Sequence, residues 1–253
     1  MNSYKRCLEI FESLVDELAL NKGERELMFD RPVVIAADIA EQFYCEKKVE
    51  LSYLYGKVET EAMLQGTEGH EKLVEGSTEV AREELFRQIF ENKSIFVLEM
   101  LLLGKYGNVV LCGKPDSVFF SRGIPLLISE YKFSRRPITY PSYHVQARTY
   151  GLLLEKIGFD TTKLFYAIVV ADPSARLDQA LKERVTLAIK EYGLKEAIIS
   201  LGNAKVYLHK YERASAEKNI DWALEFWLKK RSAIATSNFG KCRSCEYFTR
   251  CRR

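Results

Sequence analysis

The apolar residues near the start of the chain recur every three or four positions. In the segment from Tyr4 to Met28, five apolar residues would lie on one face of an α-helix: Leu8, Phe11, Leu14, Val15 and Leu18. This spacing predicts an amphipathic α-helix. Pro32 interrupts the pattern, and residues 33–44 predict a strand or short turn that leads into a helix carrying Cys45.

A different pattern begins at Ser94, where short runs of apolar, β-branched and aromatic residues predict strands. The predicted strands are Ser94–Leu103, Asn108–Phe120, Pro125–Phe133 and Leu164–Val170. Gly123 marks a tight turn between the second and third of these runs, so the two strands are expected to pair antiparallel.

Helical patterns separate and follow the strands. A helix is predicted from Tyr140 to Lys156, with Pro141 in its first turn and Gly158 just beyond its end. Three more helices are predicted, over Glu61–Val74, Ala175–Leu201 and Ile220–Ala235. One short strand is predicted over Val206–Leu208. This order of elements predicts an α/β fold with a mixed central sheet flanked by helices.

The composition describes an ordinary globular protein. The chain has 253 residues, of which 47% are hydrophobic and 29% charged. Because there are no internal repeats or low-complexity linkers, residues 1–253 are expected to form a single domain. The net charge of +3 permits a nucleic-acid partner but does not by itself argue for one.

Cysteine usage bears on the compartment and on metal binding. The chain shows no stretch with the order of a signal peptide and no apolar run that could span a bilayer, so a cytoplasmic protein without membrane contact is expected. In a reducing cytoplasm the six cysteines should be metal ligands or free thiols.

Four cysteines have the spacing of metal ligands. Cys242, Cys245 and Cys251 form a Cys-x2-Cys-x5-Cys run, and Cys45 lies far upstream. Four thiolates can hold either tetrahedral Zn²⁺ or an iron–sulfur cluster, and the spacing alone does not decide between them. Either group would join the two ends of the chain.

Between these cysteines lie residues typical of a nuclease. Glu130 and Lys132 are two apart on a predicted strand, so they project to one side, and Asp116 lies on the antiparallel neighbour. Carboxylates are the ligands that Mg²⁺ and Mn²⁺ prefer, and His70 could add a nitrogen. Lys132 would orient or deprotonate a water, or stabilise charge on a phosphate.

Gln146 and Tyr150 could complete this site, because residues four apart share one face of a helix. Each motif taken alone has a simpler interpretation. A carboxylate two positions before a lysine is usually an exposed ion pair, Pro115–Asp116 is usually a turn, and a single histidine such as His70 is usually structural. The order of the motifs and their strand context favour the catalytic interpretation.

The motifs together resemble those of the CRISPR-associated RecB-like exonucleases, which belong to the PD-(D/E)XK nuclease superfamily. The resemblance rests on Gly-Thr-Glu-Gly-His-Glu, Gly-Lys-Pro-Asp, Ser-Glu-Tyr-Lys, Gln-Ala-Arg-Thr-Tyr and the cysteine run. It implies a restriction-endonuclease-like core over residues 61–216. It also implies a helical iron–sulfur region in which residues 31–60 and 217–253 join the N- and C-terminal parts.

The resemblance implies a role for each matching residue. A 4Fe–4S cluster would be bound by Cys45, Cys242, Cys245 and Cys251. A Mn²⁺ or Mg²⁺ ion would be bound by His70, Asp116, Glu130 and the backbone carbonyl of Tyr131. The catalytic set would be Asp116, Glu130, Lys132, Gln146 and Tyr150.

The implied activity is metal-dependent degradation of single-stranded DNA, 5′ to 3′, in the preparation of new CRISPR spacers together with CRISPR integration proteins. Alternatives are a RecB-like nuclease of DNA repair, a non-catalytic DNA-binding scaffold of an integration complex, and a redox sensor that uses the cysteines. Zinc is the alternative to iron and sulfur. The sequence gives no indication of oligomeric state.

Overall fold

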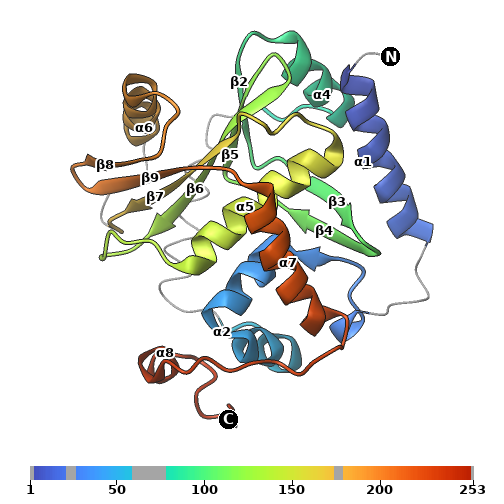
Figure 1. Ribbon diagram of the computed structural model, residues 1–253, viewed down its shortest axis with the longest axis vertical. Helices are drawn as coiled ribbons and strands as arrows, with labels where there is room; N and C mark the ends of the chain where they lie inside the picture. The colour runs from blue at the N-terminus through green and yellow to red at the C-terminus, as the bar shows by residue number, and fades with distance from the viewer. Residues whose placement is uncertain (1–2, 21–26, 59–77, 174–178, 252–253) are drawn as a thin grey trace.

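A six-stranded sheet forms the centre of the protein (Figure 1). The computed structural model describes residues 3–20, 27–58, 78–173 and 179–251. In spatial order the strands are β2 (Ile95–Leu98), β5 (Ser117–Ser121), β6 (Ile124–Phe133), β7 (Phe165–Ala171), β9 (Ala204–Lys210) and β8 (Ala197–Leu201). β6 and β7 are parallel and the other neighbours are antiparallel, which confirms the predicted mixed sheet.

A second, three-stranded sheet has the order β1 (Val34–Ile35), β4 (Val109–Gly113) and β3 (Leu102–Tyr106). The predictions of one strand over Ser94–Leu103 and one over Asn108–Phe120 are therefore wrong, because the chain changes sheets inside each run. The first run breaks at Glu99, which has a positive φ of 47°. The second breaks between β4 and β5 at residues 114–116, where Pro115 has no N–H to donate to a ladder.

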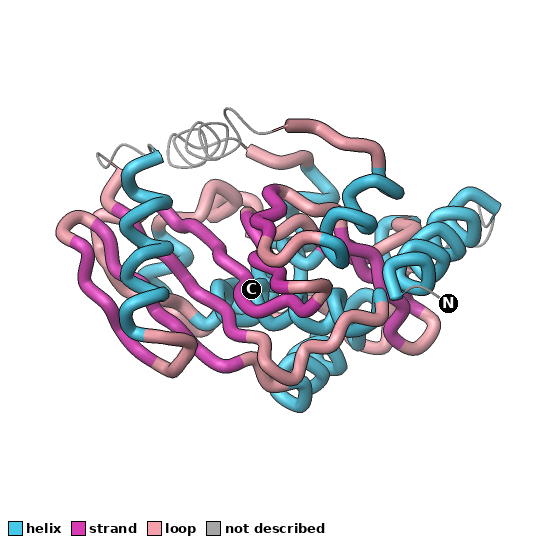
Figure 2. Tube along the Cα trace, turned by 90° about the horizontal axis from the view of Figure 1, so that it is seen from above, coloured by secondary structure: helices cyan, strands magenta, loops and turns pink. Residues whose placement is uncertain are grey.

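Helices cover both faces of the six-stranded sheet, as the view from above shows (Figure 2). Buried side chains of β7 alternate between the two faces. Tyr166, Ile168 and Val170 belong to the core shared with helix α5 (Pro141–Ile157). Ala167, Val169 and Ala171 belong to the core shared with helix α6 (Gln179–Tyr192). A strand buried on both faces reads as a continuous apolar run, as this one does.

The remaining helices lie around the α5 side and the three-stranded sheet. They are α1 (Ser3–Leu20), the 3-10 turn Met28–Asp30, α2 (Ala36–Tyr55), α4 (Arg82–Glu91), α7 (Arg213–Trp227) and α8 (Phe239–Arg243). α2 and α8 are far apart in the sequence but lie side by side at the bottom of Figure 1. Within the described ranges, no helix combines the length and apolar character needed to cross a bilayer.

Several predicted helix boundaries require correction. The helix expected over Ala175–Leu201 ends at Tyr192, where Gly193 has a positive φ of 73°, and the rest of the segment is strand β8. β8 and β9 form a hairpin in which Leu201 pairs with Ala204. Its two-residue turn starts at Gly202 (φ 67°), a turn signal that the sequence contained.

The last long helix is displaced from its predicted position. It was expected over Ile220–Ala235, whereas α7 ends at Trp227. The first predicted helix is confirmed over Ser3–Leu20, and residues 21–26 lie outside the described part of the chain. The helix from Tyr140, its stop at Gly158 (φ 106°) and the helix carrying Cys45 are confirmed. The helix predicted over Glu61–Val74 lies outside the described residues.

Candidate active site

Two buried carboxylates meet where β5 begins. Ser117 pairs with Ser129, so Asp116, just before β5, lies level with Glu130 on β6. The Asp116 Oδ2 atom accepts a hydrogen bond of 2.7 Å from the backbone N–H of Tyr131. Asp116 is 7% exposed and Glu130 only 2%, so both carboxylates lie in the low-dielectric interior where charges interact strongly.

Lys132 connects this carboxylate pair to helix α5. Its Nζ atom donates to Oε1 of Glu130 at 2.9 Å and to Oε1 of Gln146 at 2.9 Å. Burial alone would lower the pKa of Lys132, but the charge of Glu130 and its hydrogen bond, followed by the charge of Asp116, outweigh it, so the pKa is raised. Lys132 is thus held as an ammonium ion.

Helix α5 adds the predicted Gln146 and Tyr150. The Nε2 atom of Gln146 donates to the Tyr150 hydroxyl at 2.8 Å, the (i, i+4) contact that their spacing predicted. Burial and then the charge of Glu130 raise the pKa of Tyr150 well above its ordinary value, so its hydroxyl stays neutral. The bonds therefore run without interruption from Glu130 through Lys132 and Gln146 to Tyr150.

Gly113 makes room for this arrangement at the end of β4. A Cβ atom at this position would lie 2.6 Å from Cε1 of Tyr150 and 3.0 Å from Cβ of Ala36. Such distances are far inside van der Waals contact, so a side chain here would displace the Tyr150 ring. The three-stranded sheet thereby helps to fix the position of a residue in the candidate site.

Tyr143 is a member of the site that sequence reasoning did not place among the catalytic residues. The Lys132 Nζ atom lies 5.3 Å from the centre of its ring, within the range of a cation–π contact. Tyr140 packs edge-on against the same ring at 5.4 Å. The available signal was its position three residues before Gln146, on the first turn of α5. His70, the predicted nitrogen ligand, lies outside the described residues.

The four predicted cysteine ligands line one cavity of about 200 Å³ between α2 and the C-terminal segment. Cys45 comes from α2, and Cys242, Cys245 and Cys251 come from α8 and the turns after it. Asn238 caps α8 by accepting bonds from the N–H groups of Gly240 and Lys241. The backbone N–H of Thr236 donates to the Cys45 sulfur at 3.5 Å.

The cysteines surround this cavity without forming a compact group. Among the described residues, no three His, Cys, Asp or Glu side chains lie close enough together to hold one metal ion. A tetrahedral Zn²⁺ with bonds of about 2.3 Å would need its sulfurs roughly 3.8 Å apart. Four thiolates are a donor set of the kind that binds zinc or an iron–sulfur cluster.

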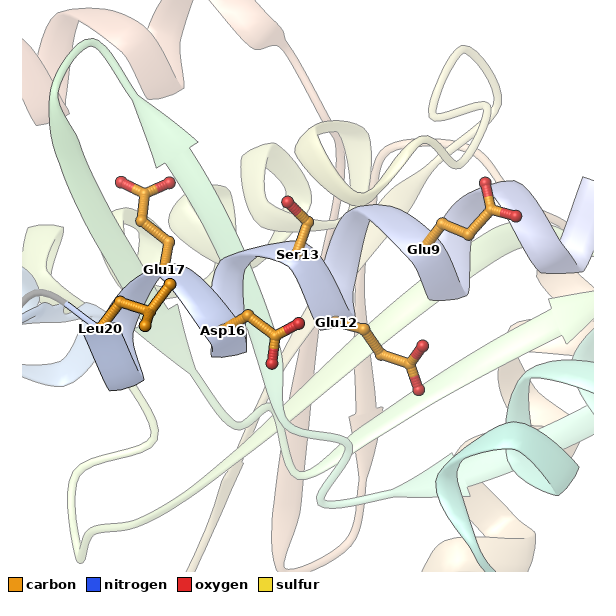
Figure 3. A pocket seen from close by; sticks show the side chains of 6 residues that line it. All are labelled: Glu9, Glu12, Ser13, Asp16, Glu17 and Leu20. Atoms are coloured by element: carbon orange, nitrogen blue, oxygen red, sulfur yellow. The ribbon is translucent and has the colours of Figure 1, made fainter.

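A shallow hollow on α1 is unrelated to either site (Figure 3). Six residues of this one helix line it, and they are Glu9, Glu12, Ser13, Asp16, Glu17 and Leu20. Leu20 is 83% exposed, and Glu17 forms an ion pair with Lys105 of β3 at 2.6 Å. The hollow is the solvated face of the amphipathic helix.

Comparison with known families identifies the fold. The sequence profile of the PD-(D/E)XK nuclease superfamily matches residues 11–252. The chain belongs to the PD-(D/E)XK nuclease superfamily. Pro115–Asp116 and Glu130–Tyr131–Lys132 spell the motif that gives the superfamily its name. Its members are generally nucleases that use Mg²⁺ or Mn²⁺ and act on DNA.

The solved structure titled "Crystal structure of SSO0001" is similar to this superfamily member at 14% sequence identity with a TM-score of 0.49. The similarity covers 96% of this chain and 93% of that chain. No curated protein matches the chain.

The buried oxygens of the site fit the divalent metal that the superfamily uses. The N–H of Tyr131 points to Asp116, and the N–H and C=O of a strand residue point to the same side. The Tyr131 carbonyl therefore faces the side on which Asp116 lies. Two carboxylates and one carbonyl form an all-oxygen donor set of the kind that Mg²⁺ and Mn²⁺ prefer.

Proposed function

We propose that this protein is a metal-dependent deoxyribonuclease that degrades single-stranded DNA from an end, in the 5′ to 3′ direction. The observation that carries the nuclease assignment is the contact of one ammonium group, that of Lys132, with both Glu130 and Gln146 beside Asp116. The exonuclease activity, the polarity and the strand preference rest on the resemblance of the motifs to CRISPR-associated RecB-like exonucleases.

These contacts support the catalytic roles that the resemblance of the motifs implies. Asp116, Glu130 and the Tyr131 carbonyl would hold the Mg²⁺ or Mn²⁺ ion, with His70 as a further ligand. When bound, such an ion lowers the pKa of a water and neutralises charge on the phosphate. An ammonium has three donors, so the bonds of Lys132 to Glu130 and Gln146 leave one for the water or a phosphate oxygen.

Gln146 and Tyr150 would keep Lys132 in place. The amide oxygen of Gln146 accepts from Lys132, and its Nε2 atom is committed to the Tyr150 hydroxyl, which fixes the orientation of the amide. In this role the two residues align the ammonium with the phosphate before the substrate arrives.

The test of the nuclease is a Glu130→Ala variant assayed on linear and circular single-stranded DNA and on duplex DNA, with Mn²⁺, Mg²⁺ or chelator. We expect the wild type to release nucleotides from linear strands only, and we expect the variant to lose cleavage by at least about a hundredfold while still binding DNA. Glu91→Ala, which removes an exposed carboxylate on α4, is the matched control. Cleavage of circular strands would overturn the exonuclease assignment, unchanged cleavage by Glu130→Ala would overturn the catalytic role of Glu130, and a wild type that binds DNA without cleaving it would favour a non-catalytic scaffold.

End-labelled substrates test the polarity in the same assay. A 5′ label should appear first in short products, and a 3′ label should stay on long strands until late. The opposite order would contradict the proposed direction without affecting the assignment as a nuclease.

We further propose that Cys45, Cys242, Cys245 and Cys251 bind a 4Fe–4S cluster, in a region formed by residues 31–60 and 217–253 beside a nuclease core of residues 61–216. Their shared cavity supports this proposal. Lys241 also lines the cavity, and its positive charge would partly offset the negative charge of four thiolates. Anaerobic purification followed by visible absorption and by iron, sulfide and zinc analysis tests it.

A Cys245→Ala variant should lose the cluster together with part of its thermal stability and DNA binding, because the cluster is one of the links between the C-terminal segment and α2. The measurements are iron content, melting temperature and DNA affinity. A variant that lacks iron but keeps the wild-type melting temperature would contradict a structural role. A colourless wild type with stoichiometric zinc would replace the cluster with a zinc site.

We also propose, from the resemblance of the motifs alone, that this activity prepares new CRISPR spacers together with CRISPR integration proteins. Sequencing of newly acquired spacers from cells that carry wild-type or Glu130→Ala protein tests the role. Equal numbers and lengths of spacers would favour the alternative of a RecB-like nuclease of DNA repair.

A further inference from the structure

Helix α2 is broken at the residue that contributes its cysteine. Cys45 has φ −167° and ψ 111°, whereas residues on both sides of it are helical. The backbone groups near the break bond to the C-terminal segment. The Tyr44 carbonyl accepts from Nζ of Lys241 at 3.1 Å, and the Lys47 N–H donates to the Ile234 carbonyl at 3.2 Å. The C-terminal segment thus satisfies groups that an unbroken helix would pair internally.

The residue after the break, Glu46, anchors this contact. It is 1% exposed, and both of its carboxylate oxygens bond to the Arg231 guanidinium. Oε1 also accepts from Nε2 of Gln42 at 2.6 Å, and Oε2 accepts from the Ile234 N–H at 2.8 Å. The buried charge is therefore fully surrounded by donors, which is the condition under which a buried ion pair is tolerated.

Arg231 is itself fixed in position by helix α7. Its Nη2 atom donates to the Trp222 carbonyl at 2.8 Å, and its guanidinium lies 4.6 Å from the Trp222 ring centre. The indole of Trp227 donates to Oε1 of Gln42 at 2.8 Å. The ion pair is consequently one part of a buried network that joins α2 to α7 and to the segment between α7 and α8.

We infer that the Glu46–Arg231 ion pair positions Cys45 opposite Cys242, Cys245 and Cys251 before any cofactor binds. Neither Glu46 nor Arg231 lines the cysteine cavity, so both would act through the backbone on each side of the break. The inference rests on the proposed use of the four cysteines as one ligand set. In addition, the ion pair would hold the four cysteines in place and would thereby determine how readily they bind their cofactor.

A purely stabilising ion pair is the alternative, and it makes a different prediction. Apolar replacements of buried ion pairs often leave stability unchanged, so stability alone does not report positioning. The proximity of Cys45 to the C-terminal cysteines in the cofactor-free chain does report it. The rate at which a short bismaleimide crosslinks Cys45 to these cysteines, mapped by mass spectrometry, measures that proximity directly.

The variant to test is Glu46→Gln in the full-length chain, since it keeps the side-chain shape and removes the charge. We expect crosslinking to slow by about tenfold or more, because Arg231 loses its buried carboxylate partner, keeps only the exposed Glu225, and the segment shifts. Iron uptake on reconstitution with ferrous iron and sulfide should fall in parallel. Glu225→Gln is the matched control, because Glu225 is the more exposed partner of the same arginine, with a contact of 3.1 Å.

Arg231→Lys keeps the positive charge but loses the two-pronged geometry, and it should give intermediate values. It decides the question if Glu46→Gln fails to fold, as judged by circular dichroism. Wild-type crosslinking and iron uptake in whichever of these variants is folded would overturn the inference. Because crosslinking needs no cofactor, a wild type that binds no iron would refute the proposed cluster while the crosslinking rates still decide the positioning role.

Discussion

At the scale of single residues, the protonated amine of Lys132 is the group on which the candidate active site is built. It contacts a carboxylate of the sheet, an amide of α5 and the ring of Tyr143. The sequence predicted that Glu130 and Lys132 project together and that Gln146 and Tyr150 share a helix face, but it did not predict the contact between Lys132 and Gln146, which depends on how α5 packs on the sheet. It did not single out Tyr143 for this role, because an aromatic residue on the first turn of a helix has many common uses.

Replacing Tyr143 tests whether its ring matters to Lys132. Tyr143→Leu should reduce cleavage by about tenfold, since a partly buried cation–π contact contributes roughly 1–2 kcal/mol. Tyr143→Phe keeps the ring and should stay close to the wild type. Steady-state cleavage of single-stranded DNA by the two variants measures this, and equal losses in both would show that the hydroxyl and not the ring is what matters.

At the scale of secondary structure elements, the active site forms where the chain passes from the small sheet to the large one. β4 ends at Gly113 and β5 begins at Ser117, so Asp116 lies in the crossing itself. The sequence predicted the strand pairing that brings Asp116 to Glu130. It did not predict the crossing, because one uninterrupted apolar run serves two sheets and apolar periodicity does not report which neighbour a strand has.

Gly113→Ala tests how far this junction positions Tyr150. The added methyl group would lie 2.6 Å from the Tyr150 ring, so we expect a loss of about 1–3 kcal/mol in the free energy of unfolding, together with reduced cleavage. Urea denaturation and cleavage assays measure the two effects. In the double variant with Tyr150→Leu the stability losses should not add, because the smaller side chain removes the clash. Additive losses would mean that Gly113 acts on something else.

At the scale of the whole molecule, contacts of α2 with the C-terminal segment bring distant parts of the sequence together. The cysteine spacing predicted that Cys45 would meet the C-terminal run, and all four residues line one cavity. The ion pair between α2 and the C-terminal segment joins two residues that are 185 positions apart, Glu46 and Arg231. No local pattern indicates which of many acidic and basic residues pair at that separation, so only the structure identifies it.

Tyr247 provides a second connection of the same kind, at the far end of α2. Its buried hydroxyl donates to the Gly56 carbonyl at 2.7 Å and accepts from the Val58 N–H at 3.2 Å. Tyr247→Phe should lower the free energy of unfolding by about 1 kcal/mol, because both backbone groups then pair only with water. Urea denaturation measures this, with Tyr192→Phe, an exposed tyrosine on α6, as the control. Equal stability of the two variants would contradict the connection.

The distance along the chain between Cys45 and Cys242 has a consequence for biosynthesis. At about 5–20 residues per second, a ribosome needs roughly 10 to 40 seconds to proceed from the first of these cysteines to the second. Throughout that interval the nascent chain carries a thiol whose partners do not yet exist, while the strands of the central sheet are already being made. Completion of the proposed set of four cysteine ligands is therefore a late event in the synthesis of the polypeptide.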